Sequence, residues 1–150
     1  MQIPLCLRPS LSIAASLIMV TAATATAQAQ TRLYSPISLT TSRQIDDTLS
    51  SQDIPTGSGG FSRDYIVTLS AGDQVAIDAT SDDFDTLVTL INKDGVTVGE
   101  NDDGSDGSTN SLLFVRITES GAYTVRVSAY AGGTNTGKFK LKVARLREVP

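Results

Sequence analysis

The sequence contains no histidine and no tryptophan, and its one cysteine, Cys6, lies close to the N-terminus. Without histidine, and without cysteine in the main part of the chain, there is no Ser-His-Asp triad, no Cys-His pair and no zinc site with histidine ligands. General acid–base catalysis also uses histidine more often than any other side chain. The composition therefore predicts a non-catalytic protein. A Ser-Lys dyad or a carboxylate pair stays formally available, and no spacing selects one.

The first 29 residues are typical of a secretory signal peptide. Arg8 is the only charged residue before residue 32, and residues 11–27 are apolar or small. The small residues of Ala27-Gln28-Ala29 predict cleavage before Gln30, and Ala25-Thr26-Ala27 is the alternative site. The apolar run is too short, and too rich in threonine, serine and alanine, for a membrane anchor. We therefore expect a secreted protein, extracellular or periplasmic, that does not insert into a membrane after cleavage.

Cleavage removes Cys6, so no disulfide can form within the mature chain and its stability must come from a buried core. It also removes Arg8, which changes the formal net charge from −4 to −5. A net negative charge argues against nucleic acid as a partner, because phosphates require a positive field. The charge is unevenly distributed, since residues 73–106 hold ten acidic side chains and one basic one, whereas residues 107–150 hold seven basic and two acidic.

Beyond the leader, short β-rich runs alternate with turn residues at the spacing of an all-β sandwich, roughly 8–12 residues apart. We expect a flexible lead over residues 30–43, one sandwich domain over 44–146 and a tail over 147–150. About eight strands are predicted. They lie at 45–50, 61–70, 74–80, 84–91, 96–100, 111–118, 122–129 and 138–143.

Alternating apolar residues on these runs predict the core. Its expected members are Leu49, Tyr65, Val67, Leu69, Val75, Ile77, Phe84, Val88, Leu90, Val115, Tyr123, Val125, Val127, Phe139, Leu141 and Val143. Four aromatic residues fall outside this pattern and are candidates for exposure, namely Tyr34, Phe61, Phe114 and Tyr130.

A hairpin with acidic groups at its open end is predicted around Asp94-Gly95, because this dipeptide favours a type I′ turn. With a two-residue loop, Lys93 faces Val96 and Asp85 lies opposite Gly104. A loop one residue longer places Asp85 opposite Asp103. Both registers bring Asp85 close to the run Asn101-Asp102-Asp103.

Two interpretations of this acidic cluster remain open. Calcium prefers six to eight oxygen ligands, and several are available from Asp83, Asp85, Asn101, Asp102 and Asp103. The spacing is not that of an EF-hand, because Gly104 and Leu113 stand where ligands are required. Alternatively, Asp85 and an aspartate of the run accept backbone N–H bonds and fix the loop, as is common in turns.

The order of several short motifs resembles the bacterial pre-peptidase C-terminal domain family, from about Ile45 to Val143. The motifs are Tyr65-Ile66-Val67-Thr68-Leu69-Ser70-Ala71-Gly72-Asp73, Phe84-Asp85-Thr86, Asp94-Gly95, Asn101-Asp102-Asp103, Gly121-Ala122-Tyr123-Thr124-Val125 and Gly137-Lys138-Phe139. The resemblance implies a secreted, non-catalytic, jelly-roll-like antiparallel β-sandwich.

The resemblance also implies a partner. Such domains usually accompany extracellular peptidases, and related collagen-binding domains bind calcium and matrix protein. Those domains take calcium ligands from an acidic segment before the first strand, whereas residues 31–44 of this chain hold no carboxylate. We expect a binding or accessory module that contacts a protein or a cell-surface polymer. The alternative is an accessory or chaperone-like partner of a separately encoded exported peptidase.

Overall fold

The computed structural model describes residues 34–39, 44–105, 107–132 and 136–146. The predicted signal peptide, the tail over 147–150 and residues 30–33 and 40–43 of the predicted lead lie outside these ranges. No helix within them is long and apolar enough to cross a membrane.

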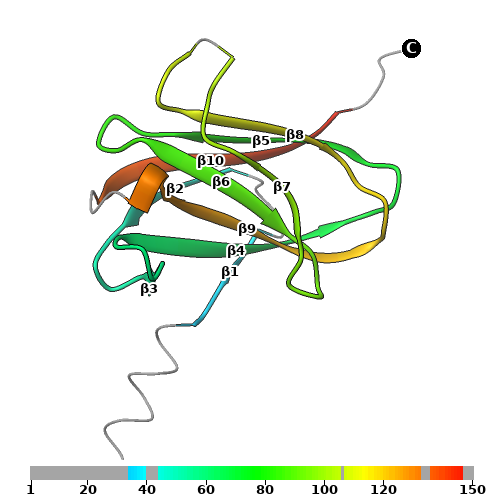
Figure 1. The fold of residues 1–150 in the computed structure, drawn as a ribbon. Coiled ribbons are helices and arrows are strands. Elements are labelled where there is room, and N and C mark those ends of the chain that lie inside the picture. Colours follow the sequence, from blue (N-terminus) through cyan, green and yellow to red (C-terminus); the bar gives the residue numbers. More distant parts are fainter. Residues whose placement is uncertain (1–33, 40–43, 106, 133–135, 147–150) are drawn as a thin grey trace, which may run out of the picture.

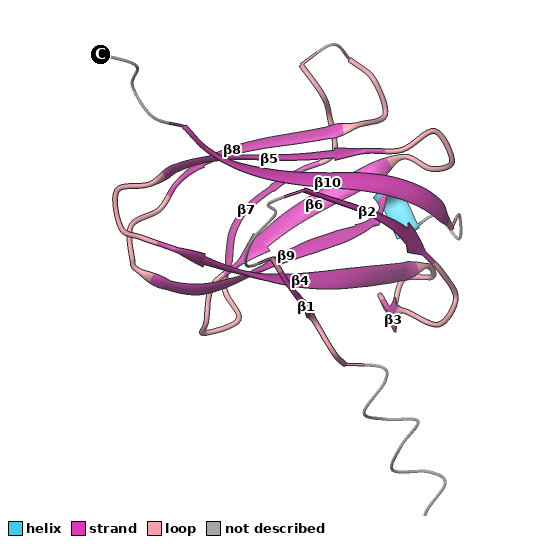
Figure 2. Cartoon of the chain, turned by 180° about the vertical axis from the view of Figure 1, so that it is seen from behind, coloured by secondary structure: helices cyan, strands magenta, loops and turns pink. Residues whose placement is uncertain are grey.

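The described residues form two β-sheets that face each other (Figures 1 and 2). Sheet A has the strand order β1-β4-β9-β6-β7, with β3 beside β4, and sheet B has the order β2-β10-β5-β8. Neighbouring strands are antiparallel except β1 and β4, which are parallel. The prediction of an all-β sandwich is therefore confirmed. The bounds are β1 Ile37–Ser38, β2 Gln44–Leu49, β3 Ile54–Pro55, β4 Phe61–Leu69, β5 Gln74–Thr80, β6 Thr86–Ile91, β7 Thr97–Asn101, β8 Ser111–Arg116, β9 Gly121–Ala129, the 3₁₀ turn η1 Tyr130–Gly132 and β10 Gly137–Leu146.

The predicted flexible lead is wrong over the part that the structure describes. Ile37 and Ser38 pair with Tyr65 and Ile66 of β4. The Leu39 N–H donates to the Ile66 carbonyl at 2.9 Å, and the Leu39 side chain is buried. This segment is ordered because it pairs with the free edge of β4 and because Leu39 reaches the core.

The hairpin of β6 and β7 turns through the longer loop and not through the predicted type I′ turn, but a bulge between Leu90 and Ile91 restores the register of the two-residue loop, in which Val88 pairs with Asn101. Gly95 N–H donates to the Asn92 carbonyl at 3.0 Å, and Asn92 N–H donates to the Val96 carbonyl at 2.9 Å. Gly95 has a φ of 80°, whereas Ala131 is the only non-glycine residue of the described ranges with positive φ. A type I′ turn requires positive φ at Asp94 as well. The Asn92 side-chain oxygen accepts the N–H groups of Asp94 and Val96, and so stabilises the wider turn.

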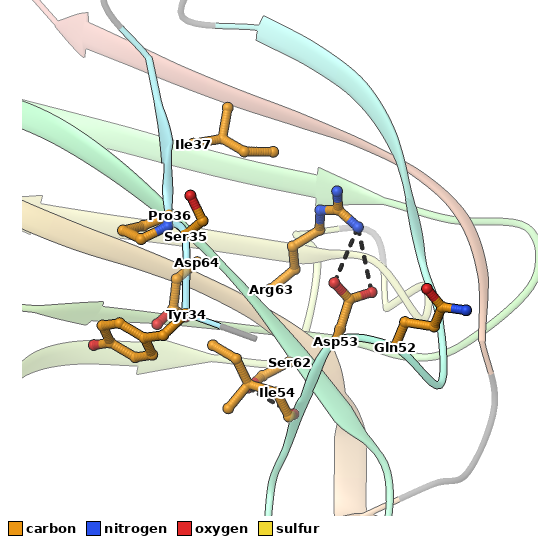
Figure 3. A pocket seen from close by; sticks show the side chains of 10 residues that line it. All are labelled: Tyr34, Ser35, Pro36, Ile37, Gln52, Asp53, Ile54, Ser62, Arg63 and Asp64. Atoms are coloured by element: carbon orange, nitrogen blue, oxygen red, sulfur yellow. Dashed lines mark hydrogen bonds and ion pairs between the residues drawn. The ribbon is translucent and has the colours of Figure 1, made fainter. Parts of the chain in front are cut away.

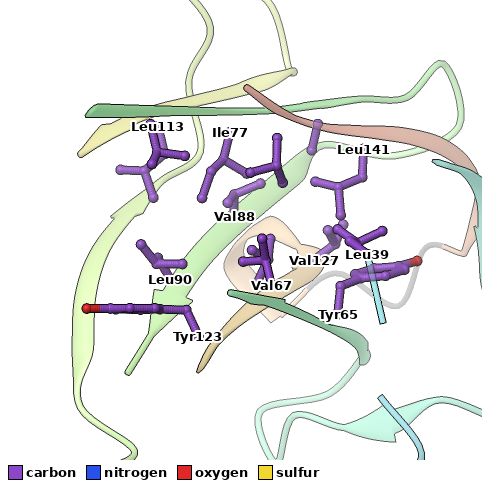
Figure 4. Packing of buried hydrophobic residues seen from close by; sticks show 14 of the residues in the cluster. Leu39, Tyr65, Val67, Ile77, Val88, Leu90, Leu113, Tyr123, Val127 and Leu141 are labelled. Atoms are coloured by element: carbon purple, nitrogen blue, oxygen red, sulfur yellow. The ribbon is translucent and has the colours of Figure 1, made fainter. Parts of the chain in front are cut away.

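The core lies between the two sheets (Figure 4). Every predicted core residue is buried except Val115, which is half-buried against the cluster. Phe61 is also half-buried against the core, so its predicted exposure is wrong, whereas Tyr34, Phe114 and Tyr130 are exposed as predicted. The expected core omitted several buried residues, which are Leu39, Ala79, Leu113, Ile117 and Ala129.

A buried polar contact joins the sheets at one end of the sandwich. The Thr86 hydroxyl lies 2.7 Å from the Ser111 hydroxyl and donates to the Ala79 carbonyl at 3.1 Å. Thr86 belongs to sheet A, whereas Ala79 and Ser111 belong to sheet B. The Thr86 N–H also donates to the Thr109 carbonyl at 2.9 Å. These bonds fix the end of the loop that carries the acidic run.

Phe84→Ala is expected to destabilise the fold by roughly 3–5 kcal/mol, because it removes a buried ring and leaves a cavity. Phe84 is 4% exposed, and its ring packs edge-to-face on Phe139 with centroids 6.1 Å apart. Chemical unfolding of the mature chain measures the change. Phe114→Ala is the matched control, because Phe114 is 61% exposed and its loss leaves no internal cavity. Equal unfolding curves for Phe84→Ala and the parent protein would contradict this packing.

Candidate functional site

The acidic end of the sandwich combines three segments that are separate in the sequence. Asp85 directly precedes β6, while Asp102 and Asp103 follow β7, which pairs with β6. Tyr130 follows β9, which pairs with β6 on its other side. The Tyr130 N–H donates to the Asp85 carbonyl at 2.9 Å. The sheet therefore places these four residues around one point, and we call them the acidic cluster.

The side chains of the acidic cluster affect one another electrostatically. Burial raises the pKa of Asp85, and the charges of Asp102 and Asp103 raise it further. The pKa of Tyr130 is raised first by the charge of Asp102, then by a hydrogen bond to that carboxylate, and further by burial and by the charges of Asp103 and Asp85. The carboxylates thus lie near one another, as either hairpin register predicts.

Asp83 and Asn101 have other roles. An Asp83 carboxylate oxygen accepts the Lys138 N–H at 2.7 Å, at the start of β10. The Asn101 amide donates to the carbonyls of Asp103 at 2.7 Å and Leu112 at 2.9 Å. Asp83 therefore holds the approach to β6 against β10, and Asn101 holds the acidic loop against β8.

The acidic cluster offers carboxylate oxygens and one phenol hydroxyl, which are the hard ligands that calcium takes. Within the described residues, no group of three or more histidine, cysteine, aspartate or glutamate side chains is arranged to hold a metal ion. Calcium binding at Asp85, Asp102 and Asp103 stays a prediction. Tyr130 was not predicted as a member of the acidic cluster, because the sequence indicated only that its side chain is exposed. No local sequence pattern predicts the turn η1.

A hollow of about 80 Å³ lies over β4, with the segment that leads into β1 on one side and β3 on the other (Figure 3). Arg63 binds Asp53 at 3.0 Å and forms an ion pair with Asp47, also at 3.0 Å. The Tyr65 hydroxyl donates to Asp47 at 2.9 Å. Burial, followed by this hydrogen bond, raises the pKa of Tyr65 far above its usual range. The charged groups beside this hollow are thus engaged with one another and hold β2, β3 and β4 together.

If calcium binds the acidic cluster, the mature chain should melt at a higher temperature in millimolar calcium than in chelator. Binding to the folded state alone adds about 2.7 kcal/mol at a hundredfold excess over Kd. Thermal unfolding with magnesium as the control measures the effect. The rise should disappear in Asp85→Asn and in Asp103→Asn. Superimposed curves in calcium and chelator would contradict the metal site and favour the loop anchor.

The raised pKa of Asp85 predicts a second signature, in chelator. A raised folded-state pKa means that ionised Asp85 destabilises the folded protein. This destabilisation is fully present above the folded-state pKa, and it disappears as the pH falls below the unfolded-state pKa. Asp85→Asn should therefore melt at the same or a higher temperature than the parent protein at pH 7, and the difference should shrink toward pH 3. A lower melting temperature for Asp85→Asn at pH 7 in chelator would show that the carboxylate anchors the loop.

The comparisons with known proteins agree with the fold. The model of the family described as "Bacterial pre-peptidase C-terminal domain" matches residues 61–129, which run from β4 to the end of β9. Among curated proteins, none matches the chain.

Two solved structures resemble the sandwich. One is described as PliG of Aeromonas hydrophila, a periplasmic inhibitor of g-type lysozyme, with 12% identity, a TM-score of 0.56, and coverage of 74% of this chain and 96% of that one. The other is the pre-peptidase C-terminal domain of a Bacillus anthracis collagenase, with 13% identity, a TM-score of 0.52, and coverage of 73% and 92%. The resemblance predicted from the sequence is therefore confirmed: residues 61–129 match the bacterial pre-peptidase C-terminal domain in sequence, and the sandwich matches such a domain in fold.

Proposed function

We propose that the chain is an exported, non-catalytic binding module that contacts a partner protein or a cell-surface polymer. The observation that carries the proposal is the contrast between a closed interior and an exposed apolar surface. Among the described residues, five large apolar side chains are at least 45% exposed on a sandwich whose core is already filled. They are Tyr34, Val96, Phe114, Tyr130 and Leu146.

The charged groups of the described residues support binding over catalysis. Asp64, the most deeply buried carboxylate in an ion pair, is held by two bonds of 2.8 Å from Arg126. Asp73 pairs with Arg145 at 3.0 Å. A bidentate arginine fixes both oxygens of a carboxylate in one geometry. The role of Asp64 in this fold is therefore to join β4 to β9.

The comparisons support a protein partner and export. The fold is shared with a protein described as a periplasmic inhibitor of a lysozyme, so a sandwich of this shape can present a protein-binding surface. The family match to pre-peptidase C-terminal domains favours an exported peptidase as the alternative partner. The predicted signal peptide favours the periplasm or the exterior for both.

A pull-down tests the proposed function. The mature chain, residues 30–150, is immobilised and exposed to periplasmic extract, culture medium and cell-wall material, with bare resin as the control. We expect retention of one protein, or retention of the module on the wall polymer, in a form that salt elutes. An exported peptidase as the retained protein would select the accessory role. Retention of nothing, or turnover of a substrate that a single aspartate or serine substitution abolishes, would contradict a non-catalytic binding module.

A further inference from the structure

Two of the exposed apolar side chains lie on the outer face of sheet B. Phe114 of β8 is 61% exposed, and Leu146 at the end of β10 is 45% exposed. Both point away from the core, since Leu113 beside Phe114 is buried, and the buried residues of β10 (Phe139, Leu141 and Val143) alternate with the face that Leu146 shares. An outward phenylalanine on an edge strand adds nothing to the core and exposes apolar area to water. Folding therefore does not account for this pair.

The strand register places the two side chains on one continuous patch. Phe114 is opposite Ala76 of β5, which is in turn opposite Ala144 of β10. The next row of the same face contains Arg116, Gln74 and Leu146. Because the alanines are short, the Phe114 ring stands above its neighbours. A hollow of about 360 Å³ opens beside it, bordered by Gln74, Phe114, Arg116 and Leu146.

The same face is basic, although the chain as a whole is acidic. Lys138, Lys140 and Lys142 alternate outward along β10, where each is exposed, and Arg116 is exposed on β8. Two carboxylates lie among them: Asp46 forms an ion pair with Lys140 at 3.8 Å, and Asp78 stands opposite Lys142. Figure 1 shows β8, β5 and β10 side by side in one layer, so patch and charges share one surface.

The outer face of sheet A differs in charge. Its central arginine, Arg126, is held by Asp64 through two bonds, and Thr89 in the neighbouring strand donates to Glu100 at 3.1 Å. Its cation is thus neutralised within the face. On sheet B, Lys138, Lys142 and Arg116 form no ion pair within the described residues. They lie on the same face as an exposed aromatic side chain, and arginine and aromatic residues are enriched at binding hot spots.

We propose that the outer face of sheet B docks an acidic segment of a partner protein. An apolar side chain of the segment occupies the hollow beside Phe114, and its carboxylates meet Lys142 and Arg116. The inference rests on the proposed binding function and names the surface and the class of partner. A polyanion without apolar side chains has no group that fills the hollow beside Phe114, so it is disfavoured as the partner. A uniformly anionic membrane is disfavoured by Asp46 and Asp78, which lie among the cations, whereas a peptide accommodates both signs.

The test uses a synthetic peptide, acetyl-Glu-Leu-Glu-Phe-Glu-amide, titrated into the ¹⁵N-labelled mature chain. We expect amide shifts at Ala76, Phe114 and Lys142 that weaken as salt rises. Phe114→Ser should weaken binding at least about fivefold, as loss of an aromatic anchor does. Lys142→Glu should weaken it and flatten the salt dependence. Val98→Ser is the matched control, because Val98 is 37% exposed on β7 of sheet A, and it should bind as the parent does.

Three results would contradict the proposal that this surface binds the partner. They are shifts confined to sheet A or to the acidic cluster, equal binding of the peptide with glutamine in place of glutamate, and binding of phosphatidylglycerol vesicles without binding of the peptide. If Phe114→Ser and the parent protein retain the same protein equally well in the pull-down, the proposed surface is wrong and the proposed binding function stands. If the parent protein retains nothing in the pull-down, the proposed binding function itself is wrong.

Discussion

The structure depends on one constraint, which is that each long strand must bury one of its faces without help from a covalent cross-link. The only cysteine of the chain is Cys6, within the predicted leader. Alternation of apolar and polar residues along each strand meets this constraint and fixes the register, because a slip of one residue would turn the apolar set outward. Tyr65, Leu90 and Leu141 are fully buried for this reason. The hydroxyl contact between Thr86 and Ser111 joins the two sheets at the acidic end of the core.

With the inner faces committed to the core, the outer faces and the loop ends are free to differ. Sheet A neutralises its central charges through Asp64 and Arg126. The acidic end brings carboxylates together beside Tyr130, and the Asn101 amide holds their loop through the carbonyls of Asp103 and Leu112. The outer face of sheet B carries Phe114 among basic side chains. Three chemically distinct surfaces thus result from one scaffold.

Most of the fold was predictable from the sequence, because period-2 alternation is strong in strands that are buried on one face. All eight long strands lie close to their predicted positions. Two features were not predictable in this way. The strand β1 forms because an edge of β4, far along the chain, is available for pairing. Its two residues are too few to show an alternation of apolar and polar side chains. The hairpin turn depends on the Asn92 side chain, which outweighs the preference of Asp94-Gly95.

The candidate site was predictable only in part. Hairpin pairing alone brings Asp85 to Asp102 and Asp103, so their proximity follows from sequence. Tyr130 joins them through β9, the neighbour of β6 on its other side, and that pairing depends on the tertiary fold. Asp83 was assigned to the same site by its position in the sequence, whereas its carboxylate is drawn away by the Lys138 N–H.

We propose that recognition takes place on the outer face of sheet B. Residues 30–150 contain no cysteine, so in a protein of these residues a single introduced cysteine can carry a spin label at a chosen position. Ala76→Cys places the label at the centre of sheet B, and Thr124→Cys places it on the outer face of sheet A. Electron paramagnetic resonance spectra with and without the partner retained in a pull-down compare the two. The account predicts immobilisation at position 76 alone. Immobilisation at position 124, with an unchanged spectrum at position 76, would contradict it.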